Sequence, residues 1–138
     1  DANDLSAQPT KLTAFDGAEF DQFGRTVAAN ADKIIVAVEY DDDNGISSGS
    51  VYVYDANDLS AQPTKLTAFD AAADDAFGSS VAATDDKIVV GARNNDDKGR
   101  DSGSVYVYDA NDLSATPTKL TAFDGDVTDY FGYSVAVG

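Results

Sequence analysis

The chain of 138 residues contains no cysteine, histidine, methionine or tryptophan. Disulfides, thiolate nucleophiles, imidazole bases and the usual zinc sites are therefore excluded. Carboxylate pairs or a serine–lysine pair would still allow catalysis, but nearly identical repeats copy every group and do not build one asymmetric pocket. We therefore expect a protein that is not an enzyme. A chain without cysteine or methionine is also hard to oxidise, which suits exposure outside a cell.

Basic residues are scarce as well. Nine lysines and arginines stand against 25 acidic residues, which gives a net charge of −16 at pH 7. Such a chain lacks the positive patches that bind nucleic acid or anionic membranes, so we expect neither partner. Long apolar runs are missing too, because the longest aliphatic run, 34–38, is far too short to cross a bilayer. The acidity suits a solubilising surface or the collection of divalent cations.

What the chain does contain is a repeat of 54 residues. Its opening stretch recurs without change at 55–70 and, apart from Thr116, at 109–124. Because the copies have hardly diverged, we expect a window cut from a longer tandem array, or a protomer completed by neighbours of the same kind. The divisions are repeat 1 at 1–54, repeat 2 at 55–108 and partial repeat 3 at 109–138.

Each repeat carries four short strand signals separated by turn residues. In repeat 1 they are RTVAAN, KIIVAVEY and SVYVYD, followed by PTKLTAF. Both faces of the strand Val51–Tyr54 are apolar or aromatic, so like sheets should cover it on each side and bury its tyrosines. The alternative for these tyrosines is a surface that stacks sugars.

This pattern predicts an all-β fold of β-propeller blades, each with four antiparallel strands. We expect about two and a half blades and ten strands: a lone fourth strand, two full sets and a lone first strand. A β-solenoid is the runner-up architecture.

Three segments of repeat 2 stand in order at 77–82 (FGSSVA), 87–92 (KIVVGA) and 102–108 (SGSVYVY). Together they resemble the FG-GAP repeat, which builds the propeller of integrin α subunits, and most closely the tandem FG-GAP repeats of large bacterial and algal surface proteins. Arg93 stands where the motif has proline, and repeat 1 has Ala37-Val38 in place of Gly-Ala.

The resemblance implies secretion or surface display, a role in adhesion or ligand binding, and Ca²⁺ held by an Asp-rich loop between the first and second strands. Here that junction reads AANADKI or AATDDKI, so the calcium ligands of the family are not carried over. A second acidic loop, 41–45, follows the second strand. The acids that both copies share there are the candidate Ca²⁺ ligands: Asp42, Asp43, Asp96 and Asp97. The alternative is a solvated loop that turns through Asn44-Gly45.

Three functional hypotheses remain. The first is a non-enzymatic extracellular structural or adhesive module whose blades pack against copies of itself or against adjacent repeats of a longer chain. The second is a propeller that binds a protein or glycan ligand, with Ca²⁺ as its cofactor where one is needed. The third is an engineered repeat propeller, since such designs also have near-identical blades.

Overall fold

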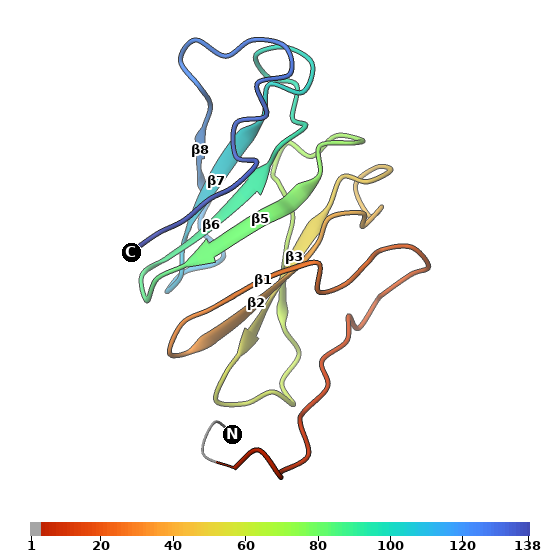
Figure 1. Ribbon diagram of the computed structural model, residues 1–138, viewed down its shortest axis with the longest axis vertical. Coiled ribbons are helices and arrows are strands. Elements are labelled where there is room, and N and C mark those ends of the chain that lie inside the picture. The colour runs from red at the N-terminus through yellow and green to blue at the C-terminus, as the bar shows by residue number, and fades with distance from the viewer. Residues whose placement is uncertain (1–3) are drawn as a thin grey trace.

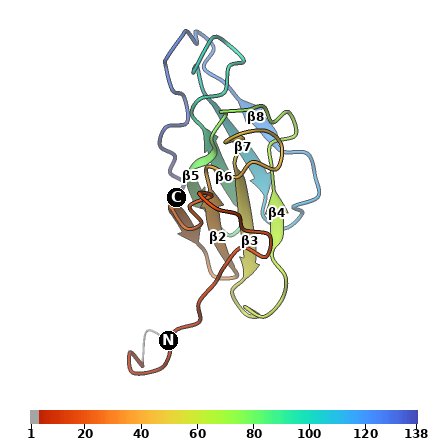
Figure 2. The ribbon, with the colours of Figure 1, turned by 90° about the vertical axis from the view of Figure 1, so that its right-hand side faces the viewer.

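The computed structural model describes residues 4–138, and this part of the chain contains strands and turns but no helix. Figure 1 shows two sheets side by side, with the β1–β2 hairpin next to β5. In Figure 2 the N-terminal part of the stretch before β1 lies apart from both sheets, and the chain then runs up to them. The strands are β1 (Thr26–Ala29), β2 (Lys33–Val38), β3 (Ser50–Asp55), β4 (Thr64–Leu66), β5 (Phe77–Ala83), β6 (Lys87–Ala92), β7 (Ser104–Asp109) and β8 (Thr118–Leu120).

Each sheet has four antiparallel strands in chain order, β1-β2-β3-β4 and β5-β6-β7-β8. The register of the second sheet repeats that of the first 54 residues later, so that Val105 faces Leu120 as Val51 faces Leu66. Turn chemistry closes the first hairpin, where the side chain of Asn30 accepts hydrogen bonds from the backbone of residues 32 and 33. The predicted fold class, with four antiparallel strands in each blade-like sheet, is confirmed.

Both faces of the first sheet are buried, as the alternation along β3 predicts. On one face Val51 and Val53 belong to a core that continues into the second sheet through Phe77, Tyr106 and Tyr108. The opposite face packs against the chain segment that precedes β1. The residues buried on that face are Val36, Val38, Tyr52 and Tyr54.

Backbone hydrogen bonds join the two sheets. The loop after β2 offers its carbonyl groups to the segment that leads into β5, and the contacts include Asp74 N to Ile46 O at 2.7 Å and Phe77 N to Ser48 O at 3.0 Å. Gly49 makes this approach possible, because it has a φ of 84° and a side chain would overlap the Phe77 carbonyl. The equivalent backbone hydrogen bonds recur one period later, where residues 128, 130 and 131 donate to the carbonyl groups of residues 100, 101 and 102.

The prediction of ten strands is wrong for the described residues. Residues 9–15 and 132–138 match strand sequences of the other repeats, yet neither segment forms a strand. A strand needs a ladder partner for its backbone groups, and these two segments have none among the described residues. Apart from β8, the only β pairing of repeat 3 among the described residues is an isolated bridge between Gly103 and Phe131.

The close approach at Gly49 can be tested with a matched pair of substitutions. Gly49→Ala combines a left-handed backbone with an overlap against backbone, so it should lower the free energy of unfolding by about 3 kcal/mol or more. Gly24→Ala carries a similar φ of 88° but meets open space, so it should cost only about 1–2 kcal/mol. Urea unfolding followed by circular dichroism measures both. Equal losses of stability in the two variants would show that the contact at Gly49 can accommodate a side chain, which would contradict the prediction.

Candidate functional site

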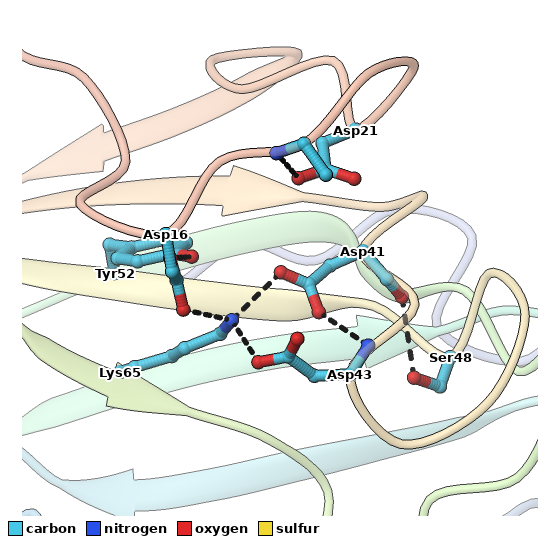
Figure 3. Close-up of polar contacts among 8 residues, drawn as sticks. Asp16, Asp21, Asp41, Asp43, Ser48, Tyr52 and Lys65 are labelled. Atoms are coloured by element: carbon cyan, nitrogen blue, oxygen red, sulfur yellow. Dashed lines mark hydrogen bonds and ion pairs between the residues drawn. The ribbon is translucent and has the colours of Figure 1, made fainter.

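The most densely connected polar cluster lies where β3 and β4 meet the acidic loop after β2 (Figure 3). Lys65 of β4 is the cross-strand neighbour of Tyr52, so both side chains share one face of the sheet. The Lys65 ammonium lies 2.8 Å from Asp16, 2.9 Å from Asp41 and 2.5 Å from Asp43. The Tyr52 hydroxyl donates to Asp16 as well. One lysine therefore ties together the acidic loop, the sheet and the segment that precedes β1.

The second sheet repeats this cluster with one change. Lys119 lies 2.6 Å from Asp70 and 2.5 Å from Asp97, and Tyr106 donates to Asp70 at 2.6 Å. Asn95 takes the place of Asp41, so Lys119 has one carboxylate fewer. Because Asp70 lies on the connection from β4 to β5, the repeated cluster fastens the segment that links the two sheets to the second sheet.

Partial burial governs the electrostatics of both clusters. Burial opposes ionisation of Asp16, but hydrogen bonds from Lys65 and Tyr52 outweigh it and hold the pKa of the carboxyl below its usual range. The pKa of Asp70 is lowered in the same way. Burial would lower the pKa of Lys65, yet its bonds to three carboxylates raise it. Burial and the bond to Asp16 raise the pKa of Tyr52 to about 12, so the phenol remains a donor.

The architecture of the two sheets agrees with a comparison of the sequence with known families. The model of the FG-GAP repeat matches residues 7–54 and 61–108. The chain belongs to the FG-GAP repeat family. A search of curated proteins found no match. The two four-stranded sheets are therefore β-propeller blades, blade 1 (β1–β4) and blade 2 (β5–β8).

The residues that name the FG-GAP family have clear places in these blades. Phe77 is fully buried, with its ring edge-on to Tyr106 at 5.3 Å between centroids. Gly78 has a φ of 92° and marks a shift of register in the ladder between β5 and β6. Phe77 therefore lies in the core between the two sheets, and Gly78 allows the backbone to take a positive φ at the start of β5.

The four candidate calcium ligands are split between two environments. Asp43 and Asp97 accept from the ammonium groups of Lys65 and Lys119. Asp42 instead accepts a hydrogen bond from Ser47 N at 2.7 Å, and Asp96 makes the same contact with Asp101 N. Within residues 4–138, no three acidic side chains are arranged to hold a metal ion. Calcium binding at these residues stays a prediction.

The lysine cluster is the part of the site that sequence reasoning missed. Lys65 lies in a strand segment, KLTA, whose neighbours are mostly apolar, and nothing in one copy pairs it with Asp16 or Asp43. The signal was the unchanged recurrence of KLTAFD in every copy. It places each lysine 49 residues after the aspartate of the preceding copy, which is the pair that meets in the structure.

The four tyrosines of β3 and β7 are interior, as predicted. Tyr52 and Tyr106 have no exposed surface, and Tyr54 and Tyr108 are at least 96% buried. Their hydroxyls find local acceptors, since Tyr54 donates to Thr13 O at 2.9 Å and Tyr108 to Thr67 O at 3.2 Å. Rings held in this way are structural, and they do not form a sugar-stacking surface.

A groove of about 390 Å³ opens beside the end of β3. Its polar wall includes Asp32, Asp55 and Asn57, and Val53 with Leu113 of blade 2 supplies apolar surface. A second groove, of about 330 Å³, is lined by the equivalent residues of blade 2, among them Asp86, Asp109 and Asn111. The groove is therefore a repeated feature of the blade.

FG-GAP repeats typically occur in extracellular proteins, and the family is generally non-enzymatic. Among residues 4–138, no helix is long and apolar enough to cross a membrane.

The carboxyl of Asp70 makes a testable contribution to stability. Its pKa is lower in the folded chain, so the stability it provides is present above the unfolded pKa and is lost as the pH falls through the folded pKa. Asp70→Asn should therefore cost about 1–3 kcal/mol at pH 7 and make the loss of stability between pH 5 and pH 3 shallower. Urea unfolding at several pH values measures this. The pKa of Asp75 is raised mainly by burial, which is the same in both proteins, and to a lesser degree by the charge of Asp70, which the substitution removes.

Asp124→Asn is the matched control for Asp70→Asn. Asp124 is the equivalent residue of repeat 3 and is exposed. Its substitution should leave both the stability at pH 7 and the pH profile unchanged. Parallel pH profiles for Asp70→Asn and the unmodified chain would contradict the assigned role of Asp70.

Proposed function

We propose that this FG-GAP chain is a non-enzymatic extracellular module with a structural or adhesive role, whose blades pack against like blades. The neighbouring blades come from copies of the chain or from adjacent repeats of a longer chain. Equivalent residues that differ in burial support this packing.

The observation that supports the proposal most directly is the difference in burial between Leu66 and Leu120. These leucines are equivalent, and Leu66 is 6% exposed because it lies in the core between the blades. Leu120 is 44% exposed on the far side of blade 2. The same side carries Phe123, which is 97% exposed, whereas Phe15 and Phe69 each pack edge-on against a tyrosine of a third strand.

The opposite side of the molecule has the complementary feature. Val81 of β5 is 9% exposed because blade 1 covers it, and its equivalent Val27 is 62% exposed. The two sides differ from one another, so neighbours that cover them would join head to tail and not through a twofold interface. Such joints produce a closed ring or an open array, and either form suits a structural or adhesive repeat.

An extension by one period tests this packing. The chain can be lengthened after Gly138 with a copy of residues 31–84, which continues the repeat in register. In the 138-residue chain, Leu66→Ala should cost about 2–5 kcal/mol and Leu120→Ala less than about 1 kcal/mol, because only Leu66 lies in a core. In the extended chain, Leu120→Ala should become as costly as Leu66→Ala. Urea unfolding measures each variant.

The extended chain itself is the second readout. Packing of the added blade should raise the urea midpoint above that of the 138-residue chain, since nearest-neighbour interfaces add to the stability of repeat proteins. An unchanged midpoint, with Leu120→Ala still harmless, would contradict the proposal.

A second candidate function is ligand binding in the repeated groove beside β3. Its carboxylate and amide groups next to apolar wall residues match the mixed polar and apolar surface of a glycan. Neutral monosaccharides titrated against the chain should shift the side-chain amide signals of Asn57 and Asn111 together in an NMR spectrum, because the two grooves share their polar lining residues. Shifts at only one of them, or at neither, would count against a glycan site of the repeat.

A further inference from the structure

Near-identical repeats face the problem of keeping their strands in the right blade. Residues 48–61 are identical to residues 102–115, so β3 and β7 have the same sequence, as do β4 and β8. Nothing in these four strands distinguishes one blade from the other. The differences are concentrated in 17–47 and 71–101, which contain the β1–β2 and β5–β6 hairpins. Exchange of hairpins between copies is the usual hazard of such repeats.

One difference is a charge reversal at the joint between the blades. Glu39 follows β2 and is 1% exposed, and the residue 54 positions later is Arg93. The two meet across the joint, with Arg93 Nη2 2.5 Å from Glu39 Oε1. Arg25 from the same repeat as Glu39 lies 3.0 Å from the other carboxylate oxygen. Neither contact is aligned as a hydrogen bond, so the attraction is mainly coulombic.

A blade joined to its own kind would lose this attraction. Two hairpins of the first kind would bring two buried glutamates together, and two of the second kind would bring two arginines together with no carboxylate between them. Like charges brought together at a buried joint are destabilising, and the arginine pair would have no opposite partner at all. Each of the two hairpins is therefore more stable next to the other kind than next to a copy of itself.

A second difference acts through shape. Gly91 of β6 has no room for a side chain, because a Cβ atom there would overlap the carbonyl oxygen of Gly132. The equivalent residue of blade 1 is Ala37. The β1–β2 hairpin therefore cannot take the place of β5–β6 without displacing the backbone of repeat 3.

We propose that Glu39 and Arg93, together with Ala37 and Gly91, are ordering residues that let a blade accept the unlike blade and reject a copy of its own kind. The surface formed by Glu39 and Arg25 thus fits a blade that carries an arginine at the position of Arg93. This inference concerns the joint within one chain and does not depend on the function proposed above.

A charge-reversal cycle on the full chain tests the electrostatic part. E39R places three arginines at one buried point and should lower the equilibrium constant for folding on the order of 100-fold. Adding R93E to it restores opposite charges and should recover on the order of 10-fold. The readout is the urea unfolding curve of E39R, R93E and the double variant. If the reduction of the folding equilibrium constant in the double variant equals the product of the two single reductions, the proposal is overturned.

Two further sets of variants keep the test decisive. If E39R does not fold, the cycle is run with E39Q and R93Q, for which the loss in the double variant should be smaller than the product of the single losses. The control is the exposed pair Asp86–Lys87, whose nitrogen and oxygen are 2.8 Å apart. Its reversal, D86K/K87D, should change the equilibrium constant by no more than about threefold.

The shape part has its own matched pair. G91A should displace the backbone at Gly132 and release Phe131 N, which bonds Ser102 O at 2.9 Å. Hydrogen exchange at that amide should accelerate at least about tenfold beyond the change in global stability. A37G, which makes blade 1 like blade 2 at this position, should leave the protection of Phe131 unchanged. Equal protection in G91A and A37G would overturn the role assigned to Gly91.

Discussion

The structure depends on the backbone contact between the loop that follows the second strand of one repeat and the segment that leads into the next repeat. These hydrogen bonds use main-chain groups, so they form wherever the chain can approach closely enough. Gly49 and Gly103 allow that approach, and both have positive φ. With the joint fixed in this way, Val51 and Val53 face Tyr106 and Phe77, and the apolar side of one sheet is covered by the next.

Repetition of this joint connects the fold to the proposed structural role. The contacts made by residues 46–48 recur at residues 100–102, although two of the three side chains there differ. A joint made by backbone tolerates such variation on the exposed side of the loops while it keeps the geometry from one blade to the next. That property is what a structural array needs, since each added repeat presents the surface that its successor requires.

The strong negative charge of the chain makes its few cations important. An aspartate that is partly buried must find an opposite charge or a donor, and the lysine of the fourth strand meets that need for Asp16 and Asp43. A metal ion at Asp43 would have to displace the Lys65 ammonium, which two further carboxylates also hold. The same cation lies 5.2 Å from the centre of the Tyr52 ring, so it supports the aromatic core as well.

The sequence was informative where the physics is local or periodic. Alternation in SVYVYD predicted sheets covered on both sides, and both faces of the first sheet are buried. The strand PTKLTAF of the first copy was predicted wrongly, because propensity without a neighbouring strand does not make a ladder. The lysine cluster and the Glu39–Arg93 pair could not be predicted, since their members are far apart in sequence and meet only when the blades are packed.

The pattern of divergence between the repeats follows from this division of labour. The third and fourth strands supply the buried tyrosine and the clamping lysine to every blade, and any change there would disturb each joint at once. The first two strands meet one particular neighbour, so a change such as glutamate to arginine can be compensated across a single joint, as Glu39 and Arg93 show. The identical third and fourth strands therefore carry the contacts that all blades share. The varied first and second strands carry the contacts that distinguish one neighbouring blade from another.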